Sequence, residues 1–146
     1  MRRAKLPALA LMGFVLLAGC SGGGPRFNPV QGKVLWRGKP PVGARVIFHP
    51  IPQTPNQLQP SALVEEDGSF HLKTYVPGNR RDYADGATSG EYRVTIDWFP
   101  LSGKSLSVGK APLTDKLEGR YADPERSSLQ ATVKDGENVL PPFELK

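Results

Sequence analysis

Apolar residues recur at every second position along most of this chain, in short runs separated by glycine, proline or Asp-Gly. This spacing is typical of β-strands with one buried and one exposed face, and it differs from the 3.6-residue spacing of a helix. In the clearest run Val94, Ile96 and Trp98 alternate with polar residues, so we expect these three side chains in the core. The pattern predicts seven strands in an antiparallel, two-layer all-β fold, at residues 30–36, 44–49, 61–66, 69–74, 91–99, 128–134 and 142–145.

The connections between these strands are of two kinds. Glu66-Asp67-Gly68-Ser69 places Asp-Gly between two strand patterns and predicts a type I′ hairpin, with Leu63 or Val64 across from Phe70 or Leu72. Two other connections, residues 75–90 and 100–126, are longer than typical loops, and loops of this length often carry function. Within the second, residues 112–117 suit a single helical turn.

The first nineteen residues have the organisation of a signal peptide. Residues 1–5 are cationic, and the twelve mostly apolar residues 6–17 are too few for a helix that crosses a bilayer, which needs about 20. The segment ends in Leu17-Ala18-Gly19-Cys20, which resembles the bacterial lipobox. The resemblance implies that a signal peptidase reads Leu17, Ala18 and Gly19, that the sulfur of Cys20 receives diacylglycerol, and that the new amine receives an acyl chain such as palmitate.

These features divide the chain into three parts. Residues 1–19 are the signal peptide, residues 20–29 are the lipidated cysteine and a flexible Gly-rich tether, and residues 30–146 are one β-domain. The expected location is the bacterial cell envelope, held by acyl chains and facing the periplasm or the cell surface. Ser21 after the cysteine favours the outer membrane under the usual sorting rule for such proteins.

Charge and cysteine content exclude several classes of protein. Three of the 19 basic residues lie in the signal peptide, so 16 remain against 14 acidic residues, interspersed without a basic stripe. Nucleic acid is therefore not an expected partner. Cys20 is the only cysteine, so the β-domain has neither a disulfide nor a thiolate metal site and depends on packing for stability.

Five short motifs follow one another in the first part of the domain: Val30-Gln31-Gly32-Lys33-Val34, Gly38-Lys39-Pro40, Val42-Gly43-Ala44-Arg45-Val46-Ile47-Phe48, Asp67-Gly68-Ser69-Phe70 and Gly90-Glu91-Tyr92-Arg93-Val94. This succession resembles the carboxypeptidase regulatory-like domain, a transthyretin-like (prealbumin-like) or Ig-like β-sandwich of seven strands. The resemblance implies an accessory module. It implies no catalytic residues, because in that family a separate enzyme carries the chemistry.

The residue types that carry chemistry are sparse. His49 and His71 lie on predicted strands, and a metal site would need carboxylates such as Glu65 or Asp97, for which no ligand spacing is present. We therefore predict no metal, no cofactor and no enzymatic activity. The expected function is that of a membrane-anchored, non-enzymatic accessory module that presents its long loops to an envelope protein or to polysaccharide.

Four aromatic residues are candidate ligand contacts. Trp36, Phe99, Tyr75 and Tyr83 combine apolar area with a polar edge and suit stacking on a sugar ring or a partner's side chain. The competing interpretation is that Trp36 caps the core and the tyrosines pack their own loop. If the rings are exposed beside a groove, a carbohydrate- or small-ligand-binding surface protein is the alternative function.

Overall fold

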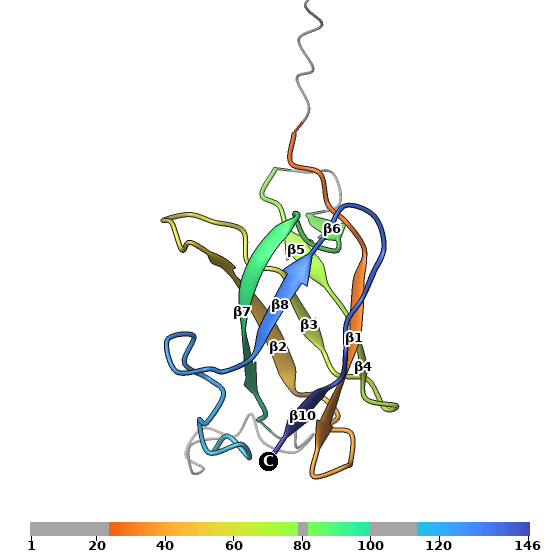
Figure 1. Ribbon diagram of the computed structural model, residues 1–146, viewed down its shortest axis with the longest axis vertical. Helices are drawn as coiled ribbons and strands as arrows, with labels where there is room; N and C mark the ends of the chain where they lie inside the picture. The colour runs from red at the N-terminus through yellow and green to blue at the C-terminus, as the bar shows by residue number, and fades with distance from the viewer. Residues whose placement is uncertain (1–23, 79–81, 100–113) are drawn as a thin grey trace, which may run out of the picture.

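The computed structural model describes residues 24–78, 82–99 and 114–146, and the regular structure in these ranges is entirely β-strand. Ten strands form two sheets (Figure 1). The four-stranded sheet contains β1 (Val30–Trp36), β4 (Ser69–His71), β9 (Asn138–Val139) and β10 (Phe143–Leu145). The six-stranded sheet has the order β6 (Tyr83–Asp85), β5 (Lys73–Tyr75), β3 (Ser61–Leu63), β2 (Arg45–Ile51), β7 (Gly90–Asp97) and β8 (Gln130–Val133). The all-β prediction is confirmed.

One hydrophobic core lies between the two sheets. Phe48 of β2 faces Phe70 of β4, with ring centroids 6.3 Å apart, and Phe70 stacks on Phe143 of β10 at 6.1 Å. Val94 and Ile96 are fully buried, as predicted. Trp98 follows the end of β7 and is only partly buried at the margin of this core.

Several predicted strands differ from those observed. The predicted strand 69–74 divides at Leu72, because β4 pairs with β1 in one sheet whereas β5 pairs with β3 and β6 in the other. The connection 75–90 is not a plain loop, since it contains β6. Strands β6 and β9 have three and two residues, too few to show the two-residue spacing by which strands are recognised.

The expectation of wholly antiparallel pairing is wrong for the four-stranded sheet. β1 is antiparallel to β4 but parallel to β9 and β10. β9 and β10 lie along the same edge of β1. Gln31 pairs with Val139 and Val34 pairs with Phe143, so the segment from β9 to β10 has one more residue between these pairs than β1 has. Pro141 and Pro142 lie at that point, and since proline has no N–H to donate, the ladder is interrupted there.

The hairpin at Asp67-Gly68 forms, but its turn is not type I′. Type I′ needs positive φ at both central residues, and here Gly68 has a φ of 85° while Asp67 is not in the left-handed region. Gly68 N–H donates to Glu65 O (3.0 Å) and Glu65 N–H donates to Ser69 O (2.8 Å), so the loop has three residues. Counting from these bonds puts Val64 opposite Phe70, one of the predicted pairings.

The helical turn predicted at residues 112–117 is not observed where the chain is described. Residues 112 and 113 lie outside the described ranges, and residues 116–120 form a hydrogen-bonded turn. The carboxylate of Asp115 organises this turn, because its oxygens accept hydrogen bonds from the N–H groups of Leu117 (3.0 Å) and Gly119 (2.9 Å). A side chain that bonds nearby backbone groups in this way favours a turn over a helix.

Candidate binding surfaces

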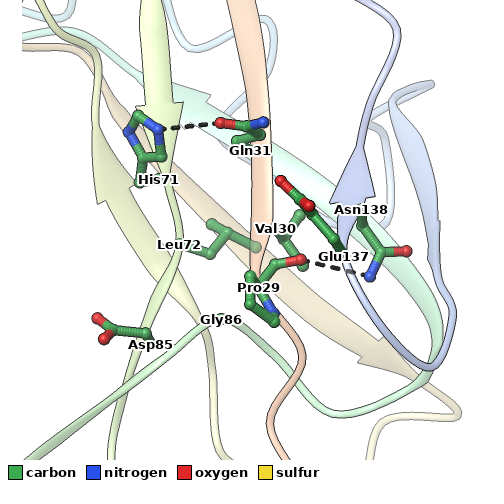
Figure 2. A pocket seen from close by; sticks show the side chains of 9 residues that line it. All are labelled: Pro29, Val30, Gln31, His71, Leu72, Asp85, Gly86, Glu137 and Asn138. Atoms are coloured by element: carbon green, nitrogen blue, oxygen red, sulfur yellow. Dashed lines mark hydrogen bonds between the residues drawn. The ribbon is translucent and has the colours of Figure 1, made fainter.

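A pocket of about 300 Å³ opens where the chain changes sheets at Leu72 (Figure 2). Because β4 stays with β1 while β5 joins β3, the two sheets separate beside this residue. Figure 2 shows Gln31 directed towards His71, while Asp85 and Glu137 lie apart from each other. The pocket is lined by Pro29, Val30, Gln31, His71, Leu72, Asp85, Gly86, Glu137 and Asn138. Its acidic side chains therefore do not converge on one point.

His71 lies between two polar partners on the outer face of the four-stranded sheet. Its Nδ1 is 3.2 Å from Glu65 Oε1, and its Nε2 is 3.2 Å from Gln31 Oε1. The side chains of Glu65 and His71 are more than half exposed. His71 thus contacts one of the carboxylates considered from the sequence, and in the described ranges no three His, Cys, Asp or Glu side chains are grouped to hold a metal ion.

A second, shallower hollow of about 530 Å³ shares Gln31 and His71 with the pocket. On its polar side, Lys33 Nζ lies 3.9 Å from Asp67 Oδ2, and Ser69 donates to Asp67 from both its N–H and its hydroxyl. The hydrogen bonds from Ser69 lower the pKa of Asp67. On the other side the rim is apolar, with Val139 70% exposed. The polar groups of this face are mostly paired with one another.

His49 lies on the outer face of the other sheet, away from His71. Its Nε2 is 2.8 Å from Thr95 Oγ1, its Nδ1 is 3.4 Å from Gln59 Nε2, and burial lowers its pKa. A hydroxyl beside an imidazole is the arrangement of an activated nucleophile. Thr95 is only 4% exposed, however, so a substrate has no access to this hydroxyl. Asp97, considered as a metal ligand, instead pairs with Arg45 at 2.7 Å.

The two candidate tyrosines are neighbours on the surface. Tyr75 of β5 is directly opposite Tyr83 of β6, with ring centroids 5.4 Å apart and an interplanar angle of 62°. They are 52% and 56% exposed, so they do not form a closed loop core. β5 and β6 lie at the end of the domain from which the described N-terminal segment leaves (Figure 1).

Trp36 is the last residue of β1, which runs from the end near the described N-terminal segment to the opposite end of the domain (Figure 1), and its ring contacts that of Trp98. The two rings meet edge to face, with centroids 5.5 Å apart. Arg37 Cζ lies 4.9 Å from the centroid of Trp36, and Lys116 Nζ lies 4.1 Å from that of Trp98. Phe99, the neighbour of Trp98 in the chain, is 37% exposed. Cation–π contacts of this kind hold a positive charge over a ring face.

The sequence interpretation missed Arg37, Trp98, Lys116 and Asp115 as members of one cluster. Trp98 was assigned to the core by its place in an alternating run, and its indole N–H instead donates to Val42 O (2.9 Å). The one available signal was that tryptophan occurs at the C-terminal end of two predicted strands, 30–36 and 91–99. The sheet topology determines which strand ends meet, and the positions of the tryptophans in the sequence do not indicate that topology.

The predicted lipidation residue Cys20 and the residues before it, Leu17, Ala18 and Gly19, lie outside the described residues. Within the described part of the chain, no helix is long and apolar enough to cross a membrane. A comparison of the sequence with models of known protein families gave no match, and a search of curated proteins found no significant relative.

Proposed function

We propose that this protein is a lipid-anchored lipoprotein of the bacterial cell envelope and that its β-domain is a non-enzymatic binding or accessory module. The observation that carries the proposal is the lipobox-like run Leu17-Ala18-Gly19-Cys20 at the end of a cationic and then apolar segment. Each buried CH₂ of an acyl chain contributes about 0.8 kcal/mol, so two or three chains on Cys20 would hold the protein durably on a membrane.

We propose further that the domain is of the carboxypeptidase regulatory-like, transthyretin-like or Ig-like kind, with a seven-stranded sandwich in which one strand is divided into β4 and β5 and to which the short strands β6 and β9 are added. Tyr92 supports this assignment. It lies near the start of β7 in the Gly90-Glu91-Tyr92 motif, and its buried hydroxyl donates to Thr88 O (2.7 Å), four residues upstream. A tyrosine that returns to the backbone in this way is typical of Ig-like sandwiches.

The arrangement of titratable groups supports a binding rather than a catalytic role. General acid–base chemistry needs a base that reaches the proton of an accessible reacting group. His71 instead contacts Glu65 and Gln31, and the hydroxyl beside His49 belongs to the buried Thr95. In both hollows that contain His71, this histidine is therefore already engaged by polar partners.

The position of the tether favours one orientation of the domain on the membrane. Asn28 is held by two backbone hydrogen bonds with Ala87, of 2.8 and 3.0 Å, so the chain becomes fixed two residues before β1. The eight residues from Cys20 to Phe27 reach at most about 28 Å. An acylated Cys20 would hold the Val30 end of β1 within this distance of the bilayer, which favours an orientation with the Trp36 end further from it.

A carbohydrate-binding function is the second candidate, and the exposed Tyr75–Tyr83 pair favours it, because paired aromatic rings offer area for a sugar ring. The experiment that tests both begins with tagged full-length protein expressed in a bacterium. Wild type should remain in the membrane fraction after a carbonate wash, be released by detergent and incorporate labelled palmitate, while Cys20→Ala should incorporate no label. Equal incorporation of label by both, or none by wild type, would refute the anchor.

Affinity capture from detergent-solubilised envelope then separates the two functions. A specific envelope protein retained with wild type supports the accessory role. Polysaccharide that is retained by wild type and lost with Tyr75→Ala supports the carbohydrate alternative. Turnover of an envelope substrate by the purified protein would refute the non-enzymatic proposal.

A further inference from the structure

At the end of the domain opposite the tether, cationic side chains surround a small hollow beside the two tryptophans. We propose that this hollow, named here the tryptophan end, binds an oxyanion, either the carboxylate or the phosphate group of an acidic polysaccharide. The tryptophan end consists of Trp36, Arg37, Trp98, Lys116, Leu117, Glu118, Arg120 and Lys146. This proposed anion site depends on the proposed function in one respect, which is the expectation that such a polymer is present in the envelope.

The two tryptophans position two of the cations. Arg37 lies over Trp36 and Lys116 lies over Trp98, and the two rings contact each other edge to face. A ring face covered by a cation is not available for a sugar, so these residues do not form a stacking platform. Instead the rings restrict the motion of the two charges, and pre-organised groups lose less entropy on binding an anion.

The backbone around Lys116 is held in place by Asp115. Its Oδ1 accepts hydrogen bonds from Trp98 N–H (2.8 Å) and Leu117 N–H (3.0 Å), and Lys116 N–H donates to Trp98 O (2.9 Å). Leu117 is 2% exposed and anchors the turn in the core. The position of Lys116 is therefore fixed by bonds that do not use its ammonium group.

Positive charge exceeds negative charge among the side chains that line this hollow. Glu118 is the one acidic side chain among those lining it in the described part of the chain, and it pairs with Arg120 at 2.9 Å. Arg120 also reaches the main-chain oxygen of Lys146, at 3.5 Å. Arg37 and Lys116 contact the rings instead, and Lys146 also lines the hollow, so these three cations, rather than Arg120, have charge available to an anion.

The size and place of the hollow select among anionic ligands. Its volume of about 20 Å³ admits one or two groups of the size of water, such as the oxygens of a carboxylate or phosphate, and excludes a whole sugar ring. Trp36 is six residues along β1 from Val30, or about 20 Å at the usual rise of a strand. In the proposed orientation this end faces away from the bilayer, which favours a polymer over a lipid headgroup.

The test uses the natural fluorescence of the protein. The sequence has two tryptophans, Trp36 and Trp98, and both lie at this end, so their emission reports on the site. Full-length protein in detergent is titrated with oligogalacturonate, with inorganic phosphate and with neutral dextran. The expected result is a saturable change with one of the anions, weakened by salt, and none with dextran. No response to either anion, or the same response to dextran, would overturn the proposal.

Substitutions at three exposed residues make the test specific. Lys116→Gln and Arg37→Gln should each weaken anion binding about five- to tenfold, and Lys116→Arg should restore most of the loss. Lys134→Gln, at the other end of the domain, is the matched control and should bind as wild type. Equal losses in all variants would show non-specific attraction. Binding to phosphatidylglycerol vesicles without binding to oligogalacturonate or phosphate would replace the polymer by a lipid surface. None of these results depends on acylation of Cys20, so failure of the anion site can be distinguished from failure of the lipid anchor.

Discussion

At the scale of single residues, Gly86 controls how the tether joins the domain. It has a φ of 93°, and a Cβ at this position would collide with the carbonyl of Asn28. Gly78 has a similar φ of 80°, and no atom of the described residues lies within 4 Å of a Cβ placed there, which makes it a matched control. We predict that Gly86→Ala lowers the free energy of unfolding by about 3 kcal/mol and Gly78→Ala by about 1 kcal/mol, as measured by urea denaturation. Equal losses would show that Asn28 is not held as described.

His49 makes stability depend on pH. Burial lowers the pKa of His49 in the folded protein, so the unfolded chain binds a proton at higher pH than the folded one does. As pH falls through the usual histidine pKa of about 6.5, the free energy of unfolding should therefore decrease, until the pH reaches the lowered pKa. We predict that His49→Gln has a flatter profile between pH 7.5 and 5.5 in thermal unfolding. A slope unchanged by this substitution would contradict the assignment.

At the scale of elements, one carboxylate joins the turn at residues 116–120 to the end of β7. Asp115 accepts hydrogen bonds from the N–H groups of Trp98, Leu117 and Gly119. Bonds to a charged acceptor contribute more than neutral ones, so Asp115→Ala should lower the free energy of unfolding by about 2 kcal/mol and shift tryptophan emission to longer wavelength. Asp123→Ala removes one backbone hydrogen bond, from Glu125 N–H (2.8 Å), and a surface pair with Arg126, so it should lower the free energy of unfolding by less, about 1 kcal/mol. A larger effect of Asp123→Ala would reverse this ranking.

Some strand bounds and buried residues could be predicted from the sequence, and others could not. The alternation of apolar residues predicts β1 at its observed bounds and the burial of Val94 and Ile96, because burial on one sheet face is what produces the pattern. The change of sheet at Leu72 could not be predicted, since that side chain is buried whether the strand is continuous or divided. For the same reason Trp98 looked like a core residue, although it lies at the margin.

Turn chemistry was only partly predictable. Asp-Gly indicates a hairpin, and a hairpin forms. Asp67 accepts hydrogen bonds from Ser69 and has a negative φ, so only Gly68 is in the left-handed region and the loop has three residues instead of two. Of the candidate site residues, the pairing of Tyr75 with Tyr83 and of Trp36 with Trp98 depends on which strands are adjacent. A single sequence contains no local pattern that shows which distant segments are adjacent in the fold.

At the scale of the whole molecule, the two ends of the domain differ in chemistry. The end near the described N-terminal segment carries the exposed Tyr75–Tyr83 pair, and the other end carries the tryptophans with their cations (Figure 1). A lipid anchor at Cys20 would bring the tyrosine end nearer to the membrane and leave the tryptophan end accessible to envelope polymers. The orientation of the domain in the envelope therefore depends on the acylation of Cys20.

The most direct test is mass spectrometry of the N-terminal peptide of protein purified from a bacterial membrane. We predict that the mature chain begins at Cys20 and carries a thioether-linked diacylglycerol, with a further acyl chain on the amine. Cys20→Ala should yield neither cleavage before residue 20 nor lipid. A wild-type chain that retains residues 1–19, or that is cleaved elsewhere and carries no lipid, would contradict the central claim.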